Sequence, residues 1–228
     1  MIANSSVLEE KIAGAREAIE IALQQQGHVC VTCSFQAEDM VVLHLVRERL
    51  PDIPVLFLET GYHFQETYRY RDQMTARYKL NLVNLMPEQT APEQEAQFGL
   101  LYQSHPDECC KLRKVRPLFR ALENYDVWFT GLRRVQSPTR ANLNRVDRFP
   151  LPSGKELLKV SPLAEWLDKD VWDFARAHDI PLLALYAQGF TSIGCEPCTA
   201  LPSDLGNPRS GRWAGHKLEC GIHIAGAQ

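Results

Sequence analysis

The chain has 228 residues, of which 45% are hydrophobic and 23% are charged, and its formal net charge is -3 at pH 7. These values are typical of a globular protein with one large core, and they argue against a nucleic-acid platform or a membrane-surface domain. No apolar run approaches the roughly 18 residues of a membrane span, and the amino terminus lacks the pattern of a signal peptide. We therefore expect no nucleic-acid or membrane partner and a cytoplasmic location, where paired cysteines more often bind metal or take part in redox chemistry than form structural disulfides.

The first half of the chain alternates helical and strand patterns. Ser6-x-x-Glu9 predicts a helix amino-terminal cap, and apolar residues at helical spacing follow it until Gly27. Short apolar, β-branched runs then predict buried strands, each followed by a helical pattern. The predicted strands are residues 29–35, 54–58 and 82–86. The predicted helices are a segment that carries Met40 to Val46 and ends before Pro51, residues about 65–78 and residues about 92–102. Such alternation predicts a parallel sheet with right-handed crossovers.

The second half continues with a fourth buried strand, residues 126–130, preceded by a helix that Pro117 is expected to break or restart. Residues 145–149 and 156–160 are typical of a hairpin, and a helix is predicted from about Glu165 to His178. From Gly189 onward the chain is dense in Gly, Pro and Ser, which predicts little regular structure. The sequence shows no internal repeat and no domain boundary before Gly189.

Ligands of open parallel sheets bind beyond the carboxyl ends of the strands. The loops that follow the first two predicted strands, residues 34–39 and 59–63, are therefore the first candidates for a binding site. The loop after the fourth strand, residues 131–140, is short and rich in cations.

Six of the seven cysteines occur in close pairs. Cys30-x-x-Cys33 has the spacing of a redox motif but lies in a predicted buried strand, where residues i and i+3 point to opposite faces. Because cysteine is also often fully buried, we interpret these two as core residues.

The other two pairs are candidate metal ligands. Cys195-x-x-Cys198 lies in a predicted loop, where two thiolates can reach one metal centre. On a helix, adjacent cysteines such as Cys109 and Cys110 diverge by roughly 100°, which suits a bulky cluster better than a single zinc ion. By spacing alone, a [4Fe–4S] cluster, a structural zinc ion and unrelated buried thiols all stay open. Cys220 is unpaired, and it is either a free thiol on the tail or a reactive one.

Three motifs together resemble the assimilatory adenylyl-sulfate (APS) reductases, which belong to the phosphoadenylyl-sulfate (PAPS) reductase family. They are Cys109-Cys110 followed by residues 111–114, Ile193-Gly194-Cys195-Glu196-Pro197-Cys198, and Glu219-Cys220-Gly221-Ile222-His223. The resemblance runs from about Val29 to Ile224 and includes Ser137-Pro138, Ser161-Pro162-Leu163 and residues 168–172. It implies a Rossmann-like adenine nucleotide alpha hydrolase fold, α/β with a mostly parallel sheet and flanking helices, which agrees with the alternation described above.

The resemblance also implies the chemistry. A cysteine at the position of Cys220 attacks the sulfur of adenosine 5′-phosphosulfate, forms an enzyme S-sulfocysteine and releases AMP; thioredoxin or glutaredoxin then releases sulfite. The expected activity is that of an oxidoreductase acting on a sulfur group in assimilatory sulfate reduction. The alternatives are a PAPS reductase, an ATP-dependent thiolation enzyme of the same superfamily, and a zinc-binding redox sensor with Cys220 as regulatory thiol.

The site residues that the resemblance implies fall into three groups. The first is a set of cations for the phosphosulfate, Lys114, Arg140, Arg209 and Arg212. The second is a pair of nucleotide loops with Ser34, Gln36, Glu59, Thr60 and Gly61. The third is a [4Fe–4S] quartet, Cys109, Cys110, Cys195 and Cys198. The cations also fit on chemical grounds, because a thiolate that attacks an anionic sulfuryl group needs positive charge nearby, and such neighbours lower a thiol pKa.

Some residues depart from the family pattern or have no assigned role. The loop at Ser34 lacks the glycines of ATP-using relatives, which argues against an ATP pyrophosphatase. Arg133 and Arg134 are either site residues or solvated surface charges. Glu219 has no assigned role, and His223 is expected to pack or orient the tail.

We expect two units. Residues 1–206 form a single α/β nucleotide-binding domain with the iron–sulfur site, and residues 207–228 form a mobile, flexible C-terminal tail that carries Cys220 to the nucleotide. A homo-oligomer is compatible with the sequence.

Overall fold

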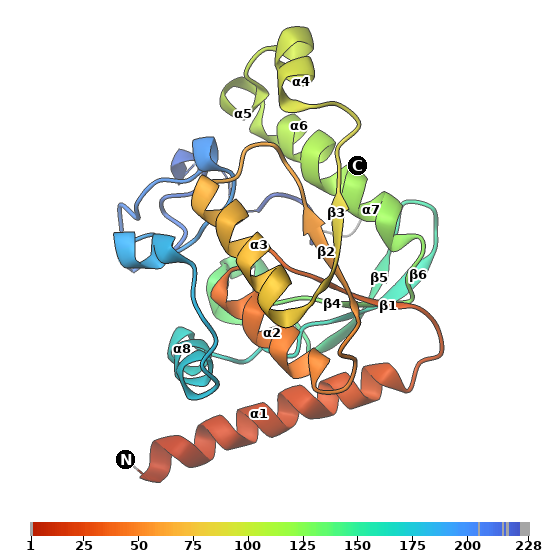
Figure 1. The fold of residues 1–228 in the computed structure, drawn as a ribbon, viewed down its shortest axis with the longest axis vertical. Coiled ribbons are helices and arrows are strands. Elements are labelled where there is room, and N and C mark those ends of the chain that lie inside the picture. Colours follow the sequence, from red (N-terminus) through yellow and green to blue (C-terminus); the bar gives the residue numbers. More distant parts are fainter. Residues whose placement is uncertain (1, 205, 216, 218, 224–228) are drawn as a thin grey trace.

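A single mixed sheet organises the computed structural model, which describes residues 2–204, 206–215, 217 and 219–223, with the backbone alone for residues 2–5. Within the described residues the sheet has six strands in the order β3-β2-β1-β4-β6-β5 (Figure 1). The strands are β1 Val29–Thr32, β2 Pro54–Leu58, β3 Asn81–Leu85, β4 Val127–Phe129, β5 Val146–Pro150 and β6 Glu156–Val160. Neighbouring strands are parallel except for the antiparallel hairpin of β5 and β6. The predicted α/β class, the mostly parallel sheet and the hairpin are therefore confirmed.

Helices cover both faces of the sheet (Figure 1). They are α1 Ile2–Leu23, α2 Ala37–Arg47, α3 Gln65–Tyr78, α4 Ala91–Phe98, α5 Leu101–Ser104, α6 Pro106–Cys110, α7 Arg116–Leu122 and α8 Asp168–Ala177. Apolar residues of α1, α2, α3 and α8 share one core with one face of the strands, and those of α7 share a second core with the opposite face. The result is a three-layer arrangement.

Alternation along the strands divides the two cores, as the pleat of a strand requires. In β1, Cys30 belongs to the core under α7, whereas Val31 belongs to the core under α2. Cys33 lies in the α2 core, on the face opposite to Cys30, and both thiols are buried. The prediction that these two cysteines pack in the core on opposite faces is confirmed.

Several predicted boundaries differ from the structure. Helix α1 begins at Ile2, so the predicted cap at Ser6 is wrong; no Pro or Gly in residues 2–5 stops the helix from extending further. The helix predicted at about residues 92–102 is divided into α4 and α5 at Gly99, whose φ of 70° is not helical.

Pro117 does not end the helix that carries Cys109 and Cys110. Helices α6 and α7 are joined through a π-helical turn, Lys111–Val115, and Pro117 lies in the first turn of α7. Proline lacks the N–H that would bond the carbonyl four residues earlier, so the chain widens locally instead of stopping. Such π turns are frequent at functional sites, and this one carries Arg113 and Lys114.

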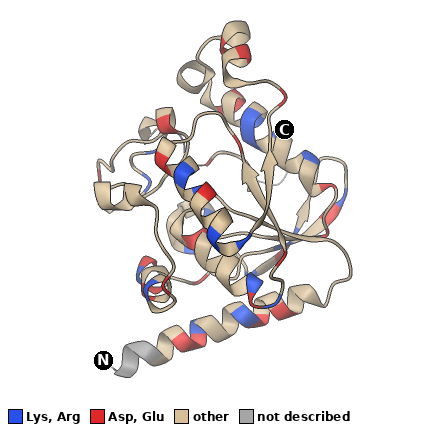
Figure 2. Ribbon diagram, viewed as in Figure 1, with Lys and Arg blue, Asp and Glu red and all other residues tan. Residues whose placement is uncertain are grey.

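After α8 the described chain contains only short 3₁₀ turns and isolated bridges, as predicted from Gly189 onward. Of the predicted tail, positions 216, 218 and 224–228 lie outside the described residues. No helix in the described part of the chain combines the length and apolar character needed to cross a bilayer. Acidic and basic residues are interspersed along α1 and α3 (Figure 2).

Candidate functional site

A cavity of about 440 Å³ opens at the carboxyl ends of β1, β2 and β4. Its lining includes Ser34 after β1, Leu58 at the end of β2 and Gly131 after β4. Residues 189–194 and parts of the tail close the other side. The position is the one where open α/β sheets bind ligands, and the volume is within the usual range for small-molecule sites.

The loop after β1 presents polar groups to this cavity. Its Phe35 has a φ of 62°, a strained value for a residue with a side chain, and the buried ring holds the turn in place. The Gln36 amide donates to Ser34 Oγ over 3.0 Å and accepts from the backbone N–H of Ile193 over 2.8 Å. The loop predicted to bind the nucleotide is therefore tied to the segment that leads to Cys195.

Asp39 joins two strand-exit loops and was not among the predicted site residues. Its carboxylate accepts hydrogen bonds from Ser34 N and Ser34 Oγ, each 2.6 Å long, and another from Gly131 N. A Cβ added at Gly131 would lie 2.3 Å from Asp39 Oδ1, so the contact requires glycine. Burial raises the pKa of Asp39 to about 6 even though the Ser34 hydrogen bonds oppose the shift.

The four predicted cations line this same cavity. Lys114 comes from the π turn, Arg140 from the turn after β4, and Arg209 and Arg212 from the tail. Arg212 is buried, and the side chains of Arg140 and Arg209 are only 11% and 17% exposed. Burial lowers the pKa values of Arg209 and Arg212, because it penalises their charged forms.

Trp213 orders the cations of the tail. Its ring lies 5.7 Å from the Arg209 guanidinium, 4.4 Å from that of Arg212 and 5.1 Å from the Lys217 ammonium. Such cation–π contacts fix the direction of long side chains at little entropic cost. Trp213 also lines a second, small cavity beside the first.

Cys220 lies on the main cavity, half-buried, and is followed by Gly221 with a φ of 92°. Its charge acts on Lys114, Arg209 and Arg212, which places it close to three of the four cations. For Lys114, burial would lower the pKa, but the thiolate charges of Cys195, Cys220 and Cys110 raise it above its ordinary value. The ammonium is therefore charged, and it lies between Cys220 and the cysteine quartet.

The second cavity is lined by all four cysteines of the predicted quartet, Cys109, Cys110, Cys195 and Cys198, and none of the four forms a disulfide. Burial and the neighbouring thiols raise the pKa values of Cys109 and Cys198 to about 11. Within the described part of the chain, no three His, Cys, Asp or Glu side chains are placed to hold one metal ion. Four free thiols around one small cavity fit the donor chemistry of a cluster, whose corners are separate, better than that of a single ion.

Two polar side chains contact the sulfurs of the quartet. Thr60, buried on the loop after β2, has its Oγ1 3.4 Å from Cys195 Sγ. Gln94, the buried residue of α4, has its amide Nε2 3.9 Å from Cys109 Sγ and accepts from Arg113 over 3.1 Å. Such partners orient ligands. Gln94 was not among the predicted site residues. The feature that could have indicated its role is a polar residue on the buried side of a short helix.

The loop Glu59-Thr60-Gly61, predicted to bind the nucleotide, contacts the quartet through Thr60. None of its three residues is among the described residues that line that cavity. The Glu59 carboxylate accepts from Gly61 N, from Tyr68 Oη over 2.6 Å and from Arg71 over 3.1 Å. Their role in substrate binding stays a prediction.

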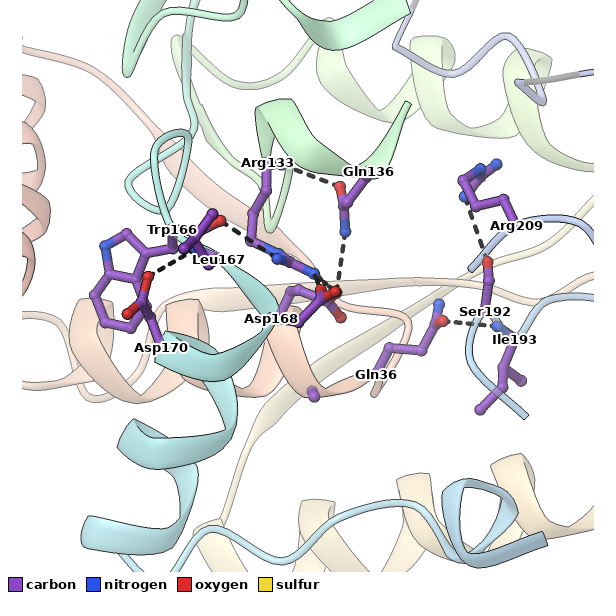
Figure 3. A network of polar contacts seen from close by, with 12 residues as sticks. Gln36, Arg133, Gln136, Trp166, Leu167, Asp168, Asp170, Ser192, Ile193 and Arg209 are labelled. Atoms are coloured by element: carbon purple, nitrogen blue, oxygen red, sulfur yellow. Dashed lines mark hydrogen bonds and ion pairs between the residues drawn. The ribbon is translucent and has the colours of Figure 1, made fainter. Parts of the chain in front are cut away.

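Arg133 is a buried member of a network at the edge of the main cavity (Figure 3). It pairs with Glu38 at 2.6 Å and Asp168 at 2.5 Å, and Gln136 donates to the same Glu38 oxygen at 3.0 Å. Of the two alternatives for Arg133, the solvated surface charge is therefore wrong. Arg134 is a half-exposed partner of Glu165 on the surface.

Glu219 and His223 are also placed by this site. Glu219 forms an ion pair with Arg140, and His223 stacks on Trp128 of β4 with ring centroids 5.4 Å apart. The packing role expected of His223 agrees with this contact. A charged residue beside a reactive cysteine was the available signal for Glu219.

Comparison with known proteins places this geometry in a family. The chain matches the phosphoadenosine phosphosulfate reductase domain over residues 28–201. It is 45% identical over 203 residues to the adenosine 5′-phosphosulfate reductase of Mycobacterium tuberculosis, which covers 85% of this chain and 78% of the relative. It is 40% identical over 224 residues to the enzyme of the same name from Staphylococcus haemolyticus, with 95% and 90% coverage.

Solved structures share the fold. The PAPS reductase of Candida auris has a TM-score of 0.71 at 24% identity, over 82% of this chain and 90% of that chain. The U34-tRNA thiolase NcsA of Methanococcus maripaludis, solved with its [4Fe-4S] cluster, has a TM-score of 0.53 at 14% identity, over 76% and 66%. These likenesses show the fold alone, whereas the domain match and the sequence relatives confirm the resemblance seen in the motifs: this chain belongs to the phosphoadenosine phosphosulfate reductase family.

Proposed function

We propose that this protein reduces adenosine 5′-phosphosulfate to sulfite and AMP in assimilatory sulfate reduction, with Cys220 as the nucleophile. The observation that carries the proposal is the convergence of Cys220, Lys114, Arg209 and Arg212 on one cavity at the carboxyl ends of the strands. The names of the bacterial relatives support the choice of substrate.

The cations have two roles in this proposal. The guanidinium groups of Arg140, Arg209 and Arg212 bind the phosphate and sulfate oxygens, for which their planar forks are suited. Lys114 stabilises the thiolate of Cys220 before attack and the negative charge on the substrate during it. Charge–charge interactions are stronger at a partly buried site than in bulk water, which favours both effects.

The first step transfers the sulfo group to the enzyme. The Cys220 thiolate attacks the sulfur, the bond from that sulfur to the bridging oxygen breaks, and AMP leaves with the electron pair. The product is a Cys220 S-sulfocysteine. In the second step a dithiol protein, thioredoxin or glutaredoxin, attacks Cys220 Sγ; the S–S bond breaks and sulfite leaves. The second thiol of the donor then resolves the mixed disulfide, so the donor is oxidised as sulfate sulfur is reduced to sulfite.

The tail has to expose the sulfonated cysteine to that donor. We propose that the segment from residue 207 opens between the two steps, as the lids of other enzymes do. The only regular element in the described part of this segment is the 3₁₀ turn Trp213–Gly215. The segment contacts the rest of the chain through an isolated bridge between Thr199 and Arg212 and through hydrogen bonds such as that of Thr191 Oγ1 to the Pro208 carbonyl over 2.6 Å.

We further propose that the quartet of Cys109, Cys110, Cys195 and Cys198 holds a [4Fe–4S] cluster. When bound, the cluster would supply structural support and an electrostatic environment for the substrate. Lys114 lines both cavities, so its ammonium group lies between the quartet and the side where Cys220 lies.

Intact-mass measurement tests the nucleophile. Incubation with APS in the absence of a thiol reductant should produce an adduct of sulfo mass that disappears in Cys220→Ser, because Cys220 lines the main cavity close to Lys114, Arg209 and Arg212. Cys30→Ser, which changes a fully buried core thiol that is not among the described residues lining the cavity, should keep the adduct.

The same measurement separates the rivals. If the wild-type protein forms no adduct and releases no AMP, the result would favour a zinc-binding redox sensor. An adduct that persists in Cys220→Ser would contradict the proposed nucleophile. With APS and PAPS at equal concentration, faster labelling by PAPS would contradict the choice of APS.

A further inference from the structure

The carboxylate of Glu219 is bound by one of the cations predicted to hold the substrate. Arg140 Nε donates to Glu219 Oε1 over 2.8 Å, and Arg140 Nη2 donates to Oε2 over 2.7 Å. Thr139 Oγ1 adds a third hydrogen bond of 3.1 Å. This two-pronged geometry is the one by which arginine binds phosphate and sulfate oxygens.

Glu219 lies inside the site and carries a charge there. Its side chain is 7% exposed, it lines the main cavity, and Arg209 Nη2 is 4.0 Å from its Oε2. Burial would raise the pKa of Glu219, but the hydrogen bonds and charge of Arg140 and the charge of Arg209 lower it below its usual value. At neutral pH a negative charge therefore already occupies Arg140 when no ligand is bound.

The position of Glu219 in the chain connects this charge to the nucleophile. It immediately precedes Cys220, and Gly221 turns the chain with a φ of 92°. On the other side of Cys220, His223 stacks on Trp128 at an interplanar angle of 16°, and its carbonyl accepts from Lys159 over 3.3 Å. The tail is thus attached on both sides of Cys220, by an ion pair before it and by a buried ring after it.

We propose that Glu219 is a positioning residue that holds Cys220 over the cavity through Arg140 and that competes, as an internal anion, with the substrate for that arginine. The inference rests on the proposed function for the identity of the substrate. Glu219 and the ligand anion share the charge of one guanidinium, so each weakens the other's interaction with Arg140 without displacing it.

The two roles of Glu219 have opposite effects on binding and on reaction. In Glu219→Gln, which keeps the shape but removes the charge, AMP should bind about three- to tenfold more tightly, because Arg140 is no longer neutralised. Adenosine, which lacks the phosphate, should bind as in the wild type. Single-turnover formation of the Cys220 adduct at saturating APS should be slower, because Cys220 is less well held.

Glu165→Gln is the matched control. Glu165 also pairs with arginines, Arg134 at 3.3 Å and Arg145 at 2.5 Å, but it is not among the residues lining the cavity. It should change neither AMP affinity nor the adduct rate. Thr139→Val, which removes one hydrogen bond to Glu219, should shift AMP affinity in the same direction as Glu219→Gln by a smaller factor.

Calorimetric titration of the anaerobically purified protein with AMP and adenosine decides the question. Weaker or unchanged AMP binding in Glu219→Gln would overturn the competition, since a supporting role alone predicts a loss. An unchanged adduct rate would overturn the positioning role. If wild-type protein forms no adduct with APS, the proposed function fails, whereas the AMP measurement still reports on Glu219.

Discussion

At the scale of single residues, the site depends on a few buried charges that the fold cannot leave unpaired. Asp39 is held by Ser34 and Gly131, Arg133 by Glu38 and Asp168, and each pair joins loops from different strands. A buried charge with hydrogen-bonded partners is costly to break, because the remaining partner is left without compensation. These pairs therefore fix the loops around the cavity more strongly than the polarity of the loops suggests.

Asp39 should give the folding equilibrium a measurable pH dependence. Its folded pKa of about 6 lies above the ordinary value of 3.8, so folding takes up a proton between these pH values. Its contribution to stability is most favourable below the unfolded pKa and declines as pH rises through about 6. The free energy of unfolding of the wild type minus that of Asp39→Asn should therefore fall by about 2 kcal/mol between pH 4 and pH 7.

Denaturant unfolding at both pH values measures this difference, because contributions from other groups cancel between the two proteins. Asp173→Asn is a suitable control: the pKa of that exposed carboxyl is lowered by Lys169, so its difference should not fall over the same range. If the free energy of unfolding of the wild type relative to Asp39→Asn increases with pH, the folded pKa of Asp39 is not raised and this prediction is wrong.

At the scale of elements, much of the arrangement follows from sequence and some of it does not. Strand and helix periodicity locates the sheet, and the rule that ligands bind at carboxyl ends locates the cavity at Ser34 and Gly131. Cys30 and Cys33 lie in different cores because side chains alternate between the two faces of a strand, so residues i and i+3 point to opposite faces. These features depend on neighbouring residues or on the order of the strands, so they can be predicted from a sequence pattern.

Features that depend on long-range contacts could not be predicted in this way. Thr60 faces Cys195 instead of the main cavity because residues 193–198 pack against the β2 exit loop, where the Glu196 N–H donates to the Tyr62 carbonyl over 2.7 Å. The ion pair of Glu219 with Arg140 joins residues 79 positions apart. The continuous helix across Pro117 also depends on packing, because a proline alone favours a break.

Helix α4 should act as a cap on the cysteine quartet through one residue. Gln94 is its buried side chain, and its amide links Arg113 to Cys109. In Gln94→Leu the sulfur loses its donor and Arg113 loses an acceptor, so iron should be lost in air about tenfold faster. The decay of visible absorbance, with iron content, measures this rate.

Gln97→Leu is the control on the same helix. Gln97 is exposed and pairs with Gln89 over 2.7 Å, so it should retain iron like the wild type. Equal decay of Gln94→Leu and wild type would show that α4 only covers the site.

At the scale of the whole molecule, two cavities share one wall. Lys114 and Trp213 line both, and Trp213 in turn contacts Arg209 and Arg212. The quartet and the proposed substrate cations are therefore not independent. Loss of the cluster proposed for the quartet should therefore change the position of the residues proposed to bind the anion.

Metal removal tests this coupling. Protein purified anaerobically should contain about four irons and four sulfides per chain, and after their removal AMP should bind at least about threefold more weakly, because Lys114 and Trp213 lose the support on one side. Adenosine affinity should change less, since the loop of Ser34 and Gln36 is anchored by Asp39 and Ile193, away from that wall. Calorimetric titration of both forms gives the comparison. Stoichiometric zinc without visible absorbance would contradict the cluster, whereas equal AMP affinity before and after iron removal would mean that the shared wall transmits nothing between the two cavities.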